Sequence, residues 1–218
     1  MSPLLTFDVQ MPKQNLPRIR TRSKDPELVK TRRKQIIDGA LRAFLKKGYD
    51  RTSIREIAQT CGMSIGALYH YVGAKEDILY LFIERGLSSA LGLIEECKRD
   101  AKAPREALRD AIDRWFRIID DIQDMTVFSY HEIGNLKGQA RQRLFDIDQS
   151  VVAVFEELLS MGVKNGDFKV SDVKLLANTI VTIGHLWALK RWYFHKHYTL
   201  DKFIKEQTEF IFRGVSQV

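Results

Sequence analysis

Features typical of secreted, membrane-bound or metal-binding proteins are scarce in this sequence. Only two cysteines occur, Cys61 and Cys97, and neither has a C-x-x-C spacing or a histidine cluster nearby. We therefore expect two buried, reduced thiols rather than a disulfide or a metal site. No apolar run reaches the roughly 18 residues of a membrane span, and the N-terminus lacks the apolar core of a signal peptide. These absences predict a cytoplasmic protein with no metal, no cofactor and no membrane partner.

Signatures of catalysis are also missing. The sequence has no nucleophile elbow, no glycine-rich phosphate loop and no H-E-x-x-H motif, and each of these marks a common class of enzyme. The acidic residues Asp120, Asp121 and Asp124 read as a solvated helix face rather than a catalytic pair. An enzyme is therefore not expected.

The net charge of +7 is unevenly placed along the chain. Residues 1–85 hold 16 Lys and Arg against 9 Asp and Glu, whereas residues 86–218 hold 19 of each. This asymmetry is typical of a polyanion-binding module joined to a neutral one. Arg18, Arg20, Arg22 and Lys24 form a charge run that also fits a solubilising tail. Charge alone does not decide between the two.

Apolar residues recur at helical spacing, and strand alternation is absent. Ile37, Ala40, Leu41 and Phe44, for example, share one helix face. Four of the five prolines fall within the first 26 residues, which indicates an arm before the first helix. The pattern predicts an all-α protein of about nine helices. They cover residues 30–47, 53–61, 64–72, 75–100, 104 to beyond 119, 126–133, 139–163, 171–195 (capped by Ser171) and 199–214 (capped by Thr199).

The second and third of these helices are short and are separated by a turn at Gly62. Ser53 and Glu56 have the spacing of a capping box, and Ser64 suits the N-cap of the next helix. Two short helices with a glycine-containing turn fit a helix-turn-helix.

The later of the two helices has two different faces. One is expected to pack on the preceding helices, and it carries Leu68, Tyr71 and Val72. The other is expected to be exposed, and it carries Gly66, Tyr69 and His70. Glycine early in a helix costs about 1 kcal/mol relative to alanine. A glycine, an aromatic ring and an imidazole on an exposed face therefore favour close approach to DNA over ordinary solvation.

Four segments resemble the signature of the TetR (tetracycline repressor) family and occur in the same order. They are AFLKKGY at 43–49, TSIREIA at 52–58, GMSIGALYHY at 62–71 and KEDIL at 75–79. The resemblance implies a flexible basic arm over 1–28, a helix-turn-helix domain over 29–75 and a helical ligand-binding and dimerisation domain over 76–218. Ala74 departs from the family pattern, because alanine cannot cap the helix that starts at Lys75.

The resemblance also implies which residues contact DNA. The expected set is Thr52, Ser53, Arg55, Ser64, Gly66, Ala67, Tyr69, His70 and Lys75. Tyr69 and Lys75 match phosphate contacts, while Ala67 and His70 match base-proximal positions. For Arg55, a DNA contact and an ion pair with a neighbouring acid are both open.

The neutral second half is rich in aromatic residues, and the family arrangement implies a ligand cavity within it. The candidate lining residues are Trp115, Phe128, His131, Arg141, Phe155, His185 and Trp187. Residues 187–200 resemble TetR regulators of fatty-acid and acyl-CoA metabolism, which implies a fatty acyl-CoA as ligand. Lys137, Arg141 and Arg143 are candidate cations for its phosphates, or a solvated helix start. A sensor of hydrophobic cations is the competing hypothesis, with Glu132 as its acid.

The helices over 171–195 and 199–214 are expected to form a homodimer. Small residues repeat along the first of them at Ala177, Val181, Gly184 and Ala188. The second is more apolar than a solvent-facing helix, with Leu200, Phe203, Ile204, Ile211 and Phe212. Packing of the same surfaces within one chain is the alternative.

The sequence therefore predicts a ligand-responsive repressor. It is expected to bind a two-fold symmetric operator and to be released by a small hydrophobic ligand such as an acyl-CoA. One alternative is a multidrug-sensing repressor of an efflux pump, and another is an architectural DNA-binding protein without sequence preference.

Overall fold

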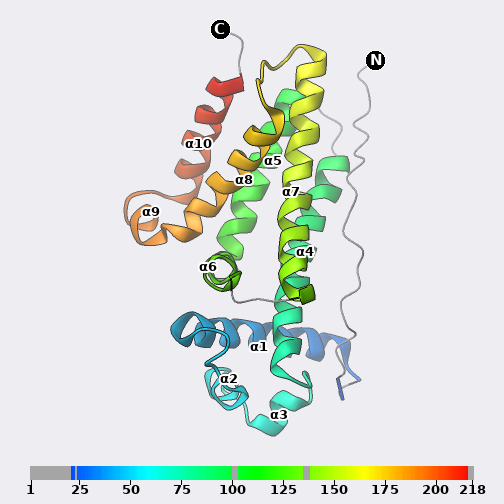
Figure 1. The fold of residues 1–218 in the computed structure, drawn as a ribbon, viewed down its shortest axis with the longest axis vertical. Helices are drawn as coiled ribbons and strands as arrows, with labels where there is room; N and C mark the ends of the chain where they lie inside the picture. Colours follow the sequence, from blue (N-terminus) through cyan, green and yellow to red (C-terminus); the bar gives the residue numbers. More distant parts are fainter. Residues whose placement is uncertain (1–20, 23, 100–102, 135–137, 216–218) are drawn as a thin grey trace. The chain divides into compact units, whose positions relative to one another are not determined.

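The computed structural model describes residues 21–22, 24–99, 103–134 and 138–215, and over these ranges it is entirely α-helical (Figure 1). This confirms the all-α prediction. The helices are α1 Pro26–Lys47, α2 Ile54–Thr60, α3 Ile65–Tyr69, α4 Lys75–Arg99, α5 Pro104–Asp121, α6 Gln123–Glu132, α7 Gly138–Asn165, α8 Val173–Leu189, α9 Arg191–His197 and α10 Leu200–Val215. No described helix has the length and apolar character needed to cross a bilayer. The expected arm lies largely outside the described residues.

The helix expected over 171–195 is two helices, so the described residues contain ten helices and not nine. The break falls at Lys190, whose φ of −112° and ψ of 30° leave the helical region. No glycine or proline marks this position, and the apolar spacing continues across it, so the sequence pattern did not reveal the break. The predicted cap Ser171 is also wrong, because Asp172 accepts the N–H of Leu175. Thr199 caps α10 as predicted by accepting the N–H of Lys202.

Contacts divide the chain into two compact units. The N-terminal unit comprises Lys13–Leu87 and Val127–Leu144, and the C-terminal unit contains Ser88–Thr126 and Phe145–Val218. Helices α4, α6 and α7 each pass from one unit into the other. The division therefore differs from the boundary expected after residue 75. The helical periodicity runs through each crossing point, so nothing in the pattern signals the change of unit.

Helix α1 is the first described helix of the N-terminal unit. Pro26 occupies the start of the helix, and the Asp25 carboxylate accepts the N–H groups of Glu27 and Leu28. The helix thus starts four residues before the expected position, because proline is favoured in the first turn, where its missing N–H is not needed. It ends at Gly48, whose φ of +84° favours glycine.

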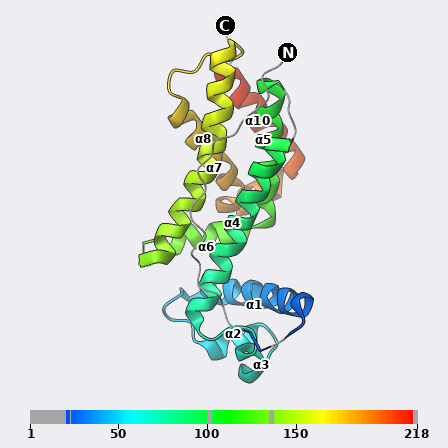
Figure 2. The same ribbon diagram turned by 90° about the vertical axis from the view of Figure 1, so that its right-hand side faces the viewer.

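The core of the N-terminal unit joins α1, α2, α3 and the first part of α4 (Figures 1 and 2). The predicted inner face of α1 is buried, and so are Ile57, Leu68, Val72 and Ile78. Phe128 of α6 completes this core, with its ring 5.5 Å from that of Phe44 and 4.8 Å from that of Phe82. The last part of α6 is therefore built into the unit that carries the helix-turn-helix.

Helix α5 is the centre of the C-terminal unit and packs against α8 and α10. Its buried face carries Leu108, Ile112, Trp115 and Phe116. The Trp115 indole N–H donates to the carbonyl of Val181 in α8 at 3.2 Å. Helix α7 contributes further fully buried residues, including Val151, Val154, Phe155 and Leu158.

Cys61 is buried and has no disulfide partner, as predicted. Its Sγ lies 3.8 Å from the carbonyl oxygen of Ile36, and burial raises the pKa of the thiol to about 11. The side chain of Cys97 lies outside the described residues.

Candidate DNA-binding surface

The helix-turn-helix is stabilised by two side-chain caps. Ser53 and Glu56 form the expected capping box on α2, with the Ser53 hydroxyl accepting the N–H of Glu56 and the Glu56 carboxylate accepting the N–H of Ser53. Ser64 then caps α3 by accepting the N–H of Ala67 at 3.1 Å. Between them Gly62 has a φ of +65°, a left-handed conformation that favours glycine. The expected turn is confirmed.

Helix α3 ends at Tyr69, before the expected end at residue 72, but the residues expected to be buried and exposed are found so. Leu68 and Val72 are fully buried, and Tyr71 is half-buried. Gly66 and His70 are exposed, and 43% of Tyr69 is exposed. A Cβ at Gly66 would meet no described atom within 4 Å, and its φ is not positive. Nothing in the described part of the protein therefore requires glycine at this position.

Arg55 is exposed on α2 and makes no hydrogen bond or ion pair with another described residue. The acid nearest in sequence, Glu56, pairs instead with Lys47 of α1. The Lys47 ammonium and the Ser53 groups lower the pKa of Glu56 to about 2. The ion-pair alternative for Arg55 thus finds no partner in the described residues.

Thr52 is placed differently from the expectation. Only 2% of it is exposed, and its hydroxyl donates to the Gly48 carbonyl at 2.8 Å. A side chain this deeply buried supports the loop between α1 and α2 and does not reach a DNA groove. The family resemblance placed it in the contact set, because sequence alone does not show that its hydroxyl is used internally.

Lys75 opens α4 with its ammonium directed into the same loop. Its Nζ lies 2.9 Å from the Tyr49 carbonyl oxygen, 3.2 Å from that of Thr52 and 3.4 Å from that of Asp50. It also lies 4.3 Å from the centroid of the Tyr49 ring. An ammonium has three N–H donors, and three acceptors surround this one. A phosphate at Lys75 would have to compete with these carbonyls.

The missing cap at Ala74 is replaced from within α4. Asp77 reaches back, and its Oδ2 accepts the N–H groups of Gly73 and Ala74 at 2.7 and 3.2 Å. An acid in the first turn is also favoured by the positive end of the helix dipole. The helix start therefore forms without a side chain at the usual cap position.

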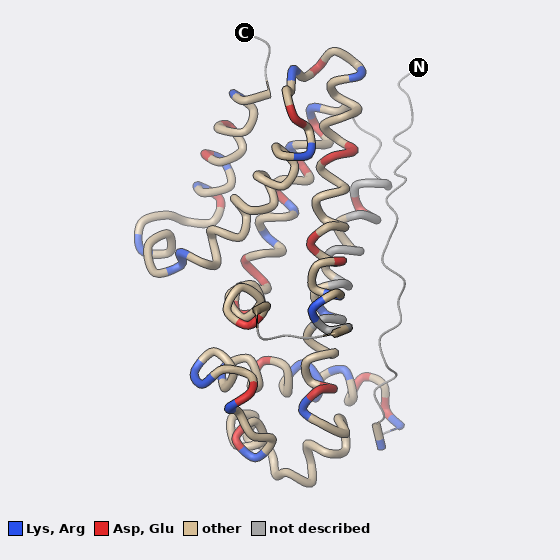
Figure 3. Tube along the Cα trace, viewed as in Figure 1, with Lys and Arg blue, Asp and Glu red and all other residues tan. Residues whose placement is uncertain are grey.

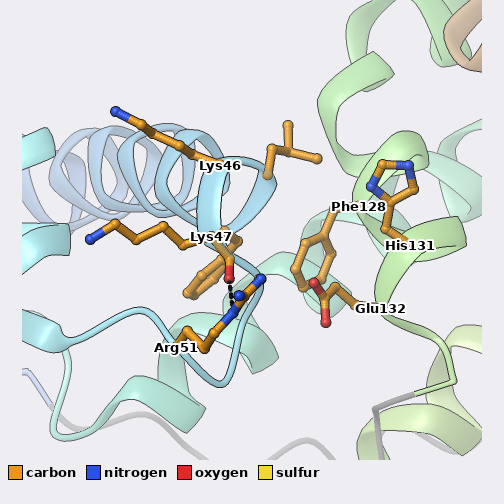
Figure 4. A pocket seen from close by; sticks show the side chains of 9 residues that line it. Lys46, Lys47, Arg51, Phe128, His131 and Glu132 are labelled. Carbon is orange, nitrogen blue, oxygen red and sulfur yellow. Dashed lines mark hydrogen bonds between the residues drawn. The ribbon is translucent and has the colours of Figure 1, made fainter.

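A cavity of about 200 Å³ lies within the N-terminal unit, between the end of α1 and the end of α6 (Figure 4). Phe128 and Glu132 face the end of α1, whereas the ammonium ends of Lys46 and Lys47 extend away from α6. Glu132 is 8% exposed and accepts the N–H of Tyr49 at 3.3 Å. Its Oε1 would lie 3.3 Å from a Cβ at Gly48. Helix α6 is thus in direct contact with the loop that Lys75 holds.

The candidate ligand residues fall in both units. Phe128, His131 and Arg141 belong to the N-terminal unit, where Phe128 is fully buried and the other two are exposed. Trp115, Phe155, His185 and Trp187 belong to the C-terminal unit and are all buried. Trp115 and His185 lie edge to face with centroids 5.5 Å apart. Arg143 is half-buried, and Lys137 lies outside the described residues.

The small-residue stripe of α8 packs within the chain. Ala177, Val181, Gly184 and Ala188 are buried inside the C-terminal unit, and a Cβ at Gly184 would lie 2.7 Å from Trp115 Nε1. Phe203, Ile204, Ile211 and Phe212 of α10 are buried as well. The alternative, packing within the chain, is therefore correct for these residues. The exposed apolar residues of the two helices are instead Leu175 and Phe210, which are 66% and 65% exposed.

Three features of this region were missed from the sequence. They are the Asp77 cap, the contact between Glu132 and the Tyr49 backbone, and a hydrogen bond from the Arg22 N–H to the His70 carbonyl. The cap had a signal, because an acid three residues after Ala74 matches half of a capping box. The other two join residues 83 and 48 positions apart, and no local pattern reports such pairs.

The chain was compared with known protein families. It matches "Bacterial regulatory proteins, tetR family" over residues 36–81 and "Tetracyclin repressor-like, C-terminal domain" over residues 101–215. The second match alone covers more than half of the chain. The first match covers the helix-turn-helix, and the second covers helices α5 to α10.

Individual relatives agree with these matches. The chain is 31% identical to the HTH-type transcriptional regulator HbdR of Aromatoleum sp. (strain CIB), over 84% of this chain and 80% of HbdR. Its fold is similar to that of AibR in complex with isovaleryl coenzyme A and operator DNA, with a TM-score of 0.69 and 21% identity over 82% of this chain and 97% of AibR. It is also similar to FadR of Bacillus subtilis in complex with stearoyl-CoA, with a TM-score of 0.62 and 24% identity over 83% and 98% of the two chains.

Proposed function

This chain belongs to the tetR family of bacterial regulatory proteins, and from that premise we propose that it is a repressor that an acyl-CoA releases from a two-fold symmetric operator. Its relatives are transcriptional regulators and not enzymes. The observation that carries the proposal is the exposed side of α3, where Gly66 and Tyr69 lie on a capped helix and His70 is its exposed C-cap.

The DNA-binding surface is proposed to consist of α3 and the exposed residues beside it. Gly66 brings the backbone of α3 close to the base edges, because no internal contact explains a glycine there. The proposed contact set still includes Ser53, Ser64 and Ala67, and Arg55 adds an exposed cation to it. An α-helix of this kind reads the major groove through its exposed residues.

Lys75 is proposed to support DNA binding by fixing the loop between α1 and α2, since three carbonyls of that loop surround its ammonium. Lys75→Met tests this role against a phosphate contact. A supporting lysine predicts weaker operator binding with an unchanged salt dependence. A lost phosphate contact would instead lower the slope of log K against log salt by about one unit for each copy of the chain.

A homodimer is proposed to form through the exposed faces of α8 and α10, with Leu175 and Phe210 at its centre. Two large apolar side chains at this exposure favour burial against a partner. A symmetric dimer places two recognition helices about 34–36 Å apart on a palindromic site.

The ligand is proposed to be an acyl-CoA. Both structural neighbours named above are described in complex with a CoA ester, and the aromatic residues Trp115, Phe155 and Trp187 are buried in the C-terminal unit. Each methylene removed from water contributes about 0.8 kcal/mol. A hydrophobic cation is the competing ligand, but Glu132, the acid expected to receive it, is already bonded to the Tyr49 N–H.

Two titrations test the proposal. A gel-shift series compares the wild-type chain on duplexes selected from a random pool with unselected duplexes, and equal affinity for both would favour an architectural protein. Palmitoyl-CoA and a lipophilic cation are then titrated separately against the selected complex. Release by palmitoyl-CoA alone supports the proposal. Release by the cation alone would replace it with the multidrug-sensing alternative.

A further inference from the structure

The segment that precedes α1 is attached to the end of the recognition helix. The Arg22 N–H donates to the His70 carbonyl at 2.9 Å, and the Thr21 hydroxyl donates to the same oxygen at 3.0 Å. His70 is the C-cap of α3, and the last carbonyls of a helix have no partner within it. Thr21 and Arg22 therefore satisfy an acceptor that α3 itself leaves open.

A second attachment holds the other end of this short segment. Three residues after Arg22, the Asp25 carboxylate caps α1 through the N–H groups of Glu27 and Leu28. Thr21 and Arg22 are thus bonded to the end of α3, and Asp25 is bonded to the start of α1. Arg22 and Lys24 are exposed in this segment, and no partner of the Arg22 guanidinium is found among the described residues.

We propose that this segment is a second DNA-reading element, in which Arg22 enters the minor groove beside the base pairs that α3 covers. The inference rests on the proposed function, since it needs α3 to lie in the major groove. Arginine is favoured in a narrow, A·T-rich minor groove, where the negative potential is strongest. A basic arm next to a major-groove helix is also a known geometry for such reading.

The charge distribution agrees with this placement. The whole excess of basic charge lies in residues 1–85, and Lys and Arg residues recur along α1, which follows Arg22 and Lys24 (Figure 3). A solubilising tail needs no attachment to α3, whereas the hydrogen bonds of Thr21 and Arg22 to the His70 carbonyl place the Arg22 backbone beside α3.

The test measures binding of the full-length wild-type chain and three variants to the selected operator by fluorescence anisotropy. Arg22→Ala removes the proposed cation, and Thr21→Val removes one bond to α3 without changing charge. Lys164→Ala is the matched control, since it removes one exposed cation from the end of α7. Each chain is measured over a salt series and on operators whose flanks are A·T-rich or G·C-rich.

Arg22→Ala should lower the salt slope by about two units for a dimer, one for each copy. It should also abolish any preference for A·T-rich flanks, while Lys164→Ala changes neither quantity. Thr21→Val should keep the charge-dependent slope but weaken the flank preference. If wild type selects its operator while Arg22→Ala retains the same slope and flank preference, the arm is only a tail and the inference is overturned. If wild type does not select an operator, the proposed function itself fails, which is a separate result.

Discussion

Gly184 of α8 and Gly66 of α3 have opposite surroundings. A Cβ at Gly184 would lie 2.7 Å from Trp115 Nε1 and 3.0 Å from Phe116 Cδ1, so α8 and α5 touch there. A Cβ at Gly66 would meet nothing within 4 Å. Gly184 is therefore explained by packing inside the chain, whereas no contact in the described part of the chain explains Gly66.

The same substitution should separate these two roles. Gly184→Ala forces a methyl group against an indole and should lower the free energy of unfolding by about 1–3 kcal/mol. Gly66→Ala should raise it by about 0.5–1 kcal/mol, because alanine favours the helix, yet weaken operator binding. Urea unfolding and gel shifts measure the two effects. Equal operator affinity for Gly66→Ala and wild type would contradict the proposed contact.

A buried histidine should make the stability sensitive to acid. Burial lowers the pKa of His185 from 6.5 to about 4. Between these values the unfolded chain binds a proton that the folded protein does not, so the free energy of unfolding falls as the pH falls from about 6.5 to 4. Above pH 6.5 the ring is neutral in both states and adds no dependence.

Unfolding of wild type and His185→Phe in urea at several pH values isolates this contribution. The phenylalanine keeps an aromatic ring beside Trp115 but cannot titrate. Over that window the unfolding free energy of His185→Phe should depend less on pH than that of wild type, by a slope that corresponds to nearly one proton. Parallel curves for the two chains throughout would show that His185 is not the acid-sensitive group.

At the scale of helices, α8 and α10 show how far sequence patterns reach. The small and apolar stripes were read correctly as contact surfaces but assigned to a partner chain, and they pack against α5 instead. Periodicity reveals that a helix face is buried and not what covers it. The helix-turn-helix was predicted in more detail, because caps, a glycine turn and exposed faces are all local properties of short segments.

The exposed residues of α8 and α10 give the corrected test of dimerisation. Leu175→Glu and Phe210→Glu place a charge on the proposed interface and should yield monomers at micromolar concentration in sedimentation velocity, with little loss of helix content. Val163→Glu alters another exposed apolar residue, at the end of α7, and should leave the dimer intact. A monomeric wild type would contradict the interface, and so would a Leu175→Glu or Phe210→Glu variant that remains dimeric.

For the whole molecule, the important fact is that α4 and α6 each belong to both compact units. The last turns of α6 hold the Tyr49 loop through Glu132, and Lys75 at the start of α4 holds the same loop. The proposed ligand can alter operator affinity only if it binds one arrangement of these helices more tightly than another. Their shared loop is our candidate for the element that changes.

Glu132→Ala should therefore reduce the effect of palmitoyl-CoA on operator binding. Coupling between two sites typically changes affinity by about 5–150-fold, and the ratio of operator Kd values with and without ligand should move towards one. Glu132→Gln keeps an oxygen acceptor and should retain most of the effect, and Tyr130→Ala controls for changes on the same helix. Anisotropy titrations give the ratio. An unchanged ratio in Glu132→Ala would exclude this contact as a route of coupling.

Because α1 and α2 are in close contact around Cys61, the reaction rate of this thiol should report how often the helix-turn-helix opens. Cys61 is 5% exposed and its sulfur would lie 2.4 Å from a Cβ at Gly39, so a thiol reagent should react slowly with it while the two helices are together. In a Cys97→Ser background, the rate at which a thiol reagent consumes Cys61 reports how often they separate. Operator DNA should slow that rate, because it binds the closed form and lowers the population of the open one. The thiol thus records DNA occupancy without any label being added to the protein.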